Sequence, residues 1–330
     1  TATTDARMNY SAFGGDLLML WLTAPFEYGF PLVTAVQSIA GLFTLLGVWA
    51  LARLIGLSRQ VSLFALCLML SMAVFVAQMT TEQVDLLVGA YTVAAVTLFY
   101  AGLRLGLHPV VGSLALALAF ATQGSMFYFL PGLALVGLVA VVAERTKARV
   151  VVRFMAISAV AVTILAAPRY LENFAAYGNP FAPSADLERL HDGSGTGGFA
   201  LEKLRLNSIC YAIQVFGPVS NPFGTFQATR PIGDWLGRVL PEEKDPHSVS
   251  RSRGDWFELF QNGRMRHEYS LIGSTGALSF VLAIFGVLLA GIRFVKTRDR
   301  TAGWILLVFL CLLSYHIFMA GLFKWSPFKF

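Results

Sequence analysis

The sequence predicts an all-α polytopic membrane protein, and three observations support this fold class. Of the 330 residues, 56% are hydrophobic and 13% charged, and the mean hydropathy is +0.65. Such values are typical of chains with several membrane-spanning helices. Apolar runs of about the length of a membrane span alternate with polar stretches. Arg and Lys residues gather in short turns between those runs, which predicts one orientation in the membrane.

The basic residues form four clusters: Arg53 with Arg59, Arg104, residues 145–153 and residues 293–300. These clusters hold 11 of the 25 Lys and Arg residues, and only two of the 19 Asp and Glu residues, Glu144 and Asp299, lie within or directly beside them. Short positively charged loops stay on the cytoplasmic side, so residues 80–85, 168–271 and 324–330 are expected on the outer side. The basic excess therefore indicates orientation and contact with anionic membrane lipids, and nucleic acid is not expected as a partner.

The first half of the chain divides into a loop and a series of helices. Residues 1–16 are polar and are expected to form an outer loop after an earlier span. Residues 17–25 are too short to cross a bilayer, which needs about 20 residues, so we expect an interfacial or re-entrant helix. Residues 30–54 are predicted to cross inward, residues 61–78 outward and residues 84–103 inward.

A shorter pair of apolar segments follows. Residues 109–121 and 127–143 flank the polar, Gly-containing turn 122–125, and neither is a full span. Because both outer ends of this unit would face the cytoplasm, we expect a helical hairpin whose tip points outward. Residues 150–167 are then predicted to cross outward and to end at Pro168.

The remaining segments define the domain organisation. Residues 168–270 are rich in Gly, Pro, Asn, Arg and Trp, and their short hydrophobic patches predict an extracytoplasmic loop region of short surface helices. Residues 271–292 are predicted to cross inward and residues 304–322 outward. We therefore divide the chain into a transmembrane bundle (1–167), the loop region (168–270) and C-terminal helices (271–330). Both ends are interpreted as incomplete.

Glu82 and Asp85 form the first candidate catalytic site, at the outer mouth of a predicted span. They are three residues apart, so on a helix both carboxylates would share a face. Acidic side chains at a membrane boundary must be hydrated, paired or bound to a ligand. The alternative is helix capping, because Thr80 or Thr81 can cap and acidic residues are favoured in a first helical turn.

Asp5 is a second candidate, since a carboxylate in an outer loop could act as a general base on an acceptor hydroxyl. Arg7 and Tyr10 of the same loop are candidate substrate-binding residues. The alternative is a solvated polar loop.

Arg169, at the outer end of a span, could bind a phosphate through its planar guanidinium group, with Tyr170 and Asn173 beside it. The alternative there is an arginine that extends to the interface beside an aromatic belt.

Three further candidates precede or follow the last predicted spans. His267 and Glu268 could contact substrate or a divalent metal, although a single pair is a weak metal signal and a solvated turn is the alternative. No metal ion is assigned, and no cofactor is certain. Lys324 lies beside Trp325, where anchoring competes with binding of an anionic lipid head group.

Four stretches, taken in order, carry a family resemblance: MNY leading into GGDLL, LARLIGLSR, QMTTEQVDL, and RYLEN followed by YGNP. Together they resemble the bacterial membrane glycosyltransferases of the GT-C fold, the group of the protein O-mannosyltransferases and the lipid A aminoarabinose transferases. The resemblance implies a polyprenyl-phosphate sugar as donor and transfer at the outer face of the bacterial inner membrane. An outer acidic residue would deprotonate the acceptor, the anomeric carbon would be inverted, and Arg169 and Lys324 would stabilise the leaving phosphate.

Two other functional classes were weighed. A non-catalytic subunit of the same fold, recruited as a structural partner in a membrane complex, remains an alternative, and it implies partner subunits. A coupled transporter is disfavoured because His316 is the only ionisable side chain deep in a predicted span and no internal repeat occurs.

Overall fold

The computed structural model describes residues 14–25, 30–79, 85–143, 147–180, 201, 204, 208 and 277–322. Within these ranges the backbone is mostly helical and contains no strand, so the predicted all-α class is confirmed for this part of the chain. The chain divides into two compact units. The first comprises Thr1–Leu70, Gln78–Leu187 and Gly286–His316, and the second Ser71–Ala77, Glu188–Phe285 and Ile317–Phe330.

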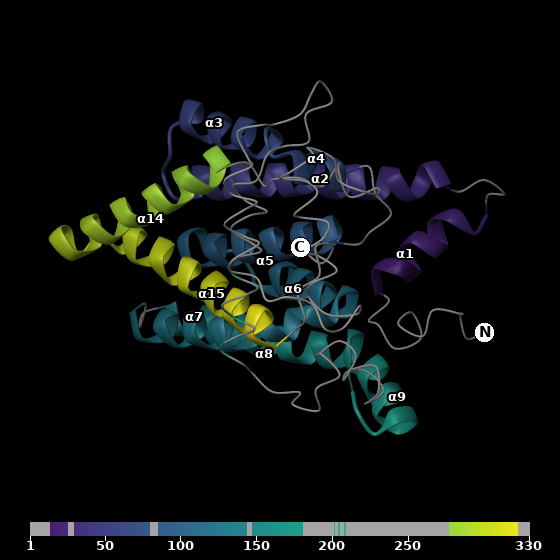
Figure 1. The fold of residues 1–330 in the computed structure, drawn as a ribbon. Helices are drawn as coiled ribbons and strands as arrows, with labels where there is room; N and C mark the ends of the chain where they lie inside the picture. Colours follow the sequence, from purple (N-terminus) through teal and green to yellow (C-terminus); the bar gives the residue numbers. More distant parts are fainter. Residues whose placement is uncertain are drawn as a thin grey trace. The chain divides into compact units, whose positions relative to one another are not determined.

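The described helices follow the predicted order along the chain (Figure 1). They are α1 (Gly14–Thr23), α2 (Phe30–Leu54), α3 (Arg59–Leu70), α4 (Ala73–Gln78), α5 (Asp85–Leu105), α6 (Val110–Thr122), the 3-10 helix η2 (Gly124–Phe129), α7 (Leu130–Ala143), α8 (Ala148–Leu165), α9 (Ala167–Tyr177), α14 (Ala277–Thr297) and α15 (Arg300–Leu322).

Four of these helices are long and apolar enough to cross a membrane: residues Thr34–Leu54, Asp85–Leu105, Ala148–Leu165 and Arg300–Ile317. Their outward faces carry large apolar side chains, such as Phe43 and Leu46, which are 63% and 60% exposed. Exposed apolar surface on this scale is typical of a protein whose surrounding solvent is lipid. The structure therefore agrees with an integral membrane protein.

One predicted span is broken. The sequence predicted a single outward crossing over residues 61–78, but α3 ends at Leu70 and α4 begins at Ala73. Ser71 lies at the break, and a serine hydroxyl competes for backbone hydrogen bonds in a helix interior, which favours a turn there. By contrast, the predicted hairpin of two short helices is present as α6, η2 and α7.

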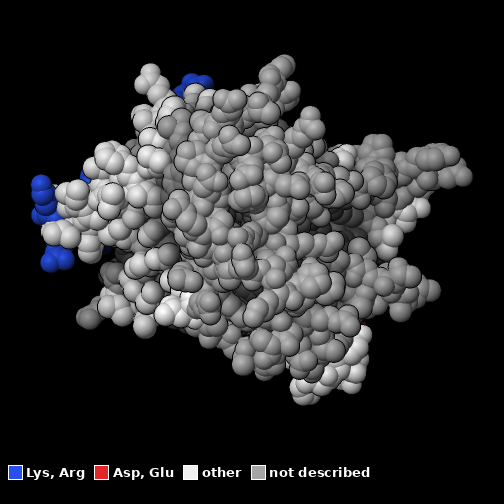
Figure 2. Space-filling view, in the orientation of Figure 1, with Lys and Arg blue, Asp and Glu red and all other residues white. Residues whose placement is uncertain are grey.

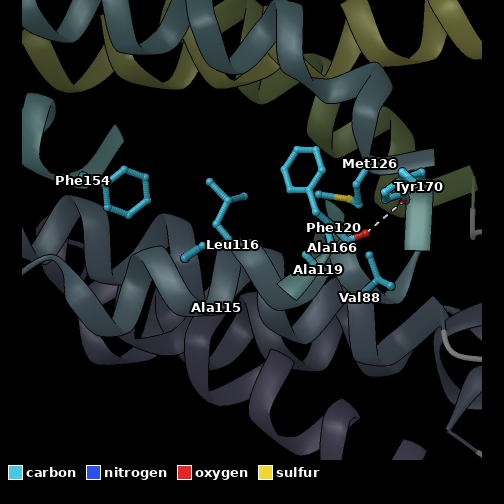
Figure 3. Close-up of a cluster of buried hydrophobic side chains, with 10 residues drawn as sticks. Val88, Ala115, Leu116, Ala119, Phe120, Met126, Phe154, Ala166 and Tyr170 are labelled. Atoms are coloured by element: carbon cyan, nitrogen blue, oxygen red, sulfur yellow. Dashed lines mark hydrogen bonds between the residues drawn. The ribbon is translucent and has the colours of Figure 1, made fainter. Parts of the chain in front are cut away.

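The core of the first unit is a row of neighbouring helices, in which α2 packs on α5, α5 on α6 and α6 on α8 (Figure 1). Small residues allow these close approaches. A Cβ atom at Gly112 of α6 would lie 3.2 Å from the Phe154 ring of α8. The Ser113 hydroxyl donates to the Phe154 carbonyl at 3.1 Å. Figure 3 shows the apolar cluster at this junction, which includes Val88, Leu116, Phe120, Met126, Phe154 and Tyr170.

At one end of this row, cationic side chains hydrogen-bond to carbonyl groups at or just beyond the helix ends. Arg53 donates to the carbonyl of Leu57 just beyond the end of α2, and Lys147 donates to the Leu103 carbonyl in the last turn of α5. Cations are favoured at these positions because the carbonyl end of a helix carries partial negative charge. Asp85 and Arg104 lie in the first and last turns of α5, about 28 Å apart at the rise of an α-helix. The acidic and basic ends predicted from the sequence are thus opposite ends of one helix.

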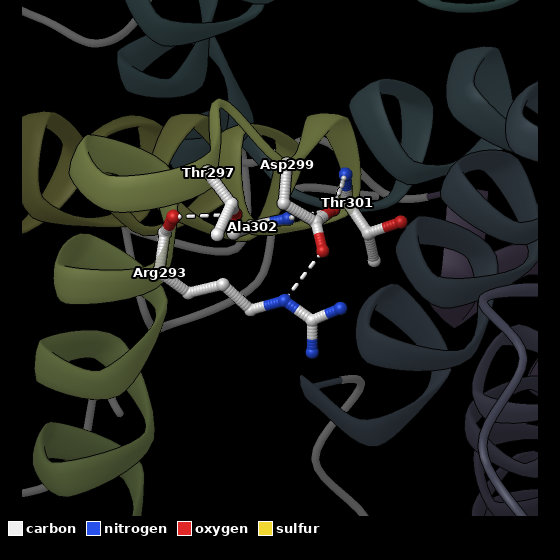
Figure 4. Close-up of polar contacts among 5 residues, drawn as sticks. All are labelled: Arg293, Thr297, Asp299, Thr301 and Ala302. Atoms are coloured by element: carbon white, nitrogen blue, oxygen red, sulfur yellow. Dashed lines mark hydrogen bonds and ion pairs between the residues drawn. The ribbon is translucent and has the colours of Figure 1, made fainter.

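The turn between α14 and α15 lies within the basic residues 293–300 (Figure 4). Asp299 accepts hydrogen bonds from the backbone N–H groups of Thr301 and Ala302, at 2.8 and 3.4 Å, and so caps α15. Its other carboxylate oxygen lies 2.5 Å from Nε of Arg293. Desolvation opposes ionisation, but these hydrogen bonds and the Arg293 charge together lower the pKa of Asp299. Figure 2 shows Lys and Arg side chains at the left edge, where Figure 1 places this turn.

Candidate functional site

Four of the residues proposed from the sequence lie in the described part of the chain: Asp85, Arg169, Tyr170 and Asn173. The other candidates lie outside the described residues: Asp5, Arg7, Tyr10, Glu82, His267, Glu268 and Lys324. The four described residues lie near the ends of α5 and α6 that are opposite the basic turns, and on α9.

Asp85 is the first residue of α5 and is half-buried. Its Oδ1 atom accepts a hydrogen bond of 3.0 Å from Nε2 of Gln123. An acidic side chain is favoured at the N-terminus of a helix, so the capping role considered from the sequence and a binding role can coexist. The Gln123 bond places this carboxylate between the beginning of α5 and the end of α6.

Gln123 is the residue that ends α6. Its backbone is extended, with φ −145° and ψ 124°, and its N–H donates to the carbonyl of Ala119. This extended residue separates α6 from η2, and its side chain reaches back to Asp85. The sequence marked residues 122–125 as a polar hairpin tip but did not assign Gln123 to the site. The sequence feature that could have identified Gln123 is an amide side chain at the tip of an otherwise apolar hairpin.

Tyr170 of α9 is buried beside the same hairpin tip. Its hydroxyl lies 3.4 Å from the Phe120 carbonyl, and its ring meets the Phe127 ring edge-on, with centroids 4.9 Å apart. A Cβ atom at Gly124 would lie 3.5 Å from this hydroxyl. The ring therefore packs against the residue that follows Gln123. Burial raises the pKa of the Tyr170 phenol, so it stays neutral at physiological pH.

The remaining polar residues of α9 either fix the helix or face outward. Asn173 is buried and donates to the Pro180 carbonyl at 3.0 Å, which holds the chain after the left-handed Gly178 (φ 68°) against the helix. Arg169 lies 3.1 Å from the Glu172 carboxylate, and their side chains are 20% and 65% exposed. Tyr170 and Asn173 thus dock α9, and Arg169 is partly buried beside the exposed Glu172.

We call Asp85, Gln123, Arg169, Tyr170 and Asn173 the polar rim. Hydrogen bonds and ring contacts connect α5, the hairpin tip and α9 through these residues. The rim offers a carboxylate that can accept a proton and a guanidinium that can bind an oxyanion. Within the described ranges, no three His, Cys, Asp or Glu side chains are grouped as metal ligands.

Comparisons with protein-family models, with curated proteins and with solved structures find no match for this chain.

Proposed function

We propose that this protein is a membrane glycosyltransferase of the GT-C type. It transfers a sugar from a polyprenyl-phosphate donor to an acceptor on the extracytoplasmic face of a bacterial inner membrane. The observation that carries the proposal is the Asp85 carboxylate, held by Gln123 at the end of a membrane-length helix opposite the basic turns. An ionisable side chain at the boundary of a membrane span is a candidate functional residue.

Asp85 is the described candidate for the general base. In an inverting displacement the carboxylate accepts the proton of the acceptor hydroxyl, and the hydroxyl oxygen bonds to the anomeric carbon. The bond from that carbon to the phosphate oxygen breaks, and the polyprenyl phosphate leaves with the electron pair. The Gln123 amide donates to Oδ1, which orients the carboxylate.

Arg169 is the described candidate for contact with the leaving phosphate. Its partner Glu172 is mostly exposed, and exposed ion pairs contribute little stability. The guanidinium can therefore exchange this carboxylate for a phosphate, which it binds through two parallel hydrogen bonds. Tyr170 and Asn173 are better suited to positioning the helix that carries Arg169, because both are buried in contacts with protein atoms.

The test is Asp85→Asn in the full-length protein, assayed in vesicles that contain radiolabelled polyprenyl-phosphate sugar. Loss of a general base should reduce transfer by about 10²- to 10⁴-fold. Asp299→Asn removes the same charge in the turn between α14 and α15 and should keep wild-type transfer. Wild-type transfer by Asp85→Asn would remove Asp85 from the mechanism. Donor binding with no transfer by any form of the chain would favour the alternative, a non-catalytic subunit of the same fold.

A further inference from the structure

Gln37 is a second polar group inside the bundle, and the polar rim does not account for it. It lies in α2 and has 0% exposure. Neither its amide oxygen nor its amide nitrogen has a hydrogen-bond partner among the described residues. An amide buried in this way costs free energy, and native structures nearly always satisfy such groups. We therefore expect the Gln37 amide to hydrogen-bond a group that lies outside the described residues.

The contacts of α2 show which helix Gln37 faces. Gln37, Ala40, Thr44 and Gly47 are all at least partly buried and recur at helical spacing, so they form one stripe along α2. Gly47 meets α5 at the end of that stripe. Its carbonyl accepts a hydrogen bond of 3.2 Å from Thr97, and a Cβ atom there would lie 2.6 Å from Val93. Gln37 accordingly lies on the face of α2 that packs against α5.

The same contacts set the level of Gln37 along α5. Ser38 of α2 donates to the Met79 carbonyl at 2.9 Å, whereas Gly47 contacts residues 93 and 97. Met79 lies six residues before α5 and meets Ser38, whereas Val93 and Thr97 within α5 meet Gly47, so α2 and α5 run in the same direction. Gln37 precedes Gly47 by ten residues and therefore lies level with the first turn of α5, which begins with Asp85.

We propose that the Gln37 amide hydrogen-bonds a hydroxyl oxygen at the level of Asp85, inside the outer end of the bundle. The hydroxyl belongs either to a bound water or to the sugar of the donor, which present the same chemistry to an amide. This assignment deepens the proposed function and, for the sugar, rests on it.

Ser158 provides a useful contrast. It is the other buried side chain without a hydrogen-bond partner in the described ranges, and it lies on α8. A serine hydroxyl can rotate to bond with the carbonyl four residues earlier in its own helix, so it needs no ligand. A glutamine amide has two donor hydrogens and an acceptor, and its own helix cannot satisfy all of them.

The test is Gln37→Met, which keeps an unbranched side chain and removes both polar atoms. Full-length protein in detergent is heated with and without polyprenyl-phosphate sugar, and Leu45→Met in the same helix is the matched control. If the amide binds a water, the thermal midpoint falls below that of the wild type without donor. If the amide binds the sugar, the thermal midpoint of Gln37→Met without donor equals or exceeds that of the wild type. The apparent affinity for the donor then falls about tenfold, as expected for one lost hydrogen bond.

An unchanged or higher midpoint together with wild-type donor affinity would overturn the proposal, because the amide would then be a buried group that binds nothing. Neither measurement requires turnover, so the outcome is separate from that of the Asp85 experiment. If the donor does not bind any form of the protein, the test depends on the thermal midpoint without donor. A lower midpoint for Gln37→Met than for the wild type supports a bound water, and any other result overturns the proposal.

Discussion

Replacing Gly132 by alanine should separate α15 from α7. A Cβ atom at this position would lie 2.5 Å from Sγ of Cys311 and 2.9 Å from both Cα of Cys311 and Oγ of Ser314. Unstrained contacts between such atoms begin at about 3.5 Å, so α15 would have to withdraw by roughly 1 Å. Two of the obstructing atoms belong to Cys311, and one of these is backbone, so a side-chain rotation cannot relieve the clash.

The magnitude follows from two opposing effects. Alanine favours a helix over glycine by about 1 kcal/mol, whereas overpacking a well-packed junction costs about 1 to 3 kcal/mol. We therefore expect a net loss of about 1 to 2 kcal/mol. The stacked rings of Phe129 and Tyr315, with centroids 3.9 Å apart, belong to the same junction and should be disturbed with it.

The assay is thermal unfolding of the purified protein in detergent, with Gly137→Ala as the matched control. Gly137 is also buried in α7, but a Cβ atom there would meet Met155 at 3.6 Å, an ordinary contact. The control should unfold at or slightly above the wild-type temperature because only the gain in helix propensity remains. If Gly132→Ala matches or exceeds the wild type, the packing of α15 against α7 described above is wrong.

Two further predictions concern hydrogen-bonded carboxylates at opposite ends of the bundle. In a double-mutant cycle with Asp85→Ala and Gln123→Leu, thermal unfolding should give a coupling energy of about 1 kcal/mol, and strictly additive losses would exclude the bond. Asp299 has a pKa below its ordinary value of 3.8, so its charge stabilises the fold above that pH and ceases to do so as pH falls through the lowered pKa. The gap in thermal midpoint between the wild type and Asp299→Asn should therefore close below about pH 4, and a gap that is independent of pH would contradict this role.

Helices with a strong local signal could be predicted from the sequence. The range of α2, residues 30–54, was predicted residue for residue, because it is mostly apolar and its only charged residue, Arg53, marks the C-terminal end. The α6–α7 hairpin was predicted from two apolar segments too short to span and a polar turn between them. The break at Ser71 was missed, since a single serine within an apolar run does not lower hydropathy enough to interrupt it.

Pairings between residues far apart in the chain could not be predicted from the sequence. Asp85 was proposed from its place at a helix start, but its partner Gln123 is 38 residues away. That pairing depends on the packing of α6 against α5, which local patterns do not specify. Gln37 was not singled out either, because one glutamine in an apolar helix resembles a tolerated polar residue until its burial is known. Tyr170 and Asn173 were named as substrate-binding candidates, and in the structure each donates a hydrogen bond to a backbone carbonyl, which local patterns do not specify either.

The positions of the polar groups also bear on the choice between the proposed enzyme and a purely structural subunit. A structural role requires helices that pack on one another, and small residues such as Gly47, Gly112 and Gly132 already provide that packing. It does not require a half-buried carboxylate and a buried amide at the same level of neighbouring helices, and the amide lowers stability unless it is bonded. Selection for stability alone would replace Gln37 with an apolar residue. Its presence level with Asp85 is therefore an argument for a bound hydroxyl group, of a water or of the donor sugar, at this end of the bundle.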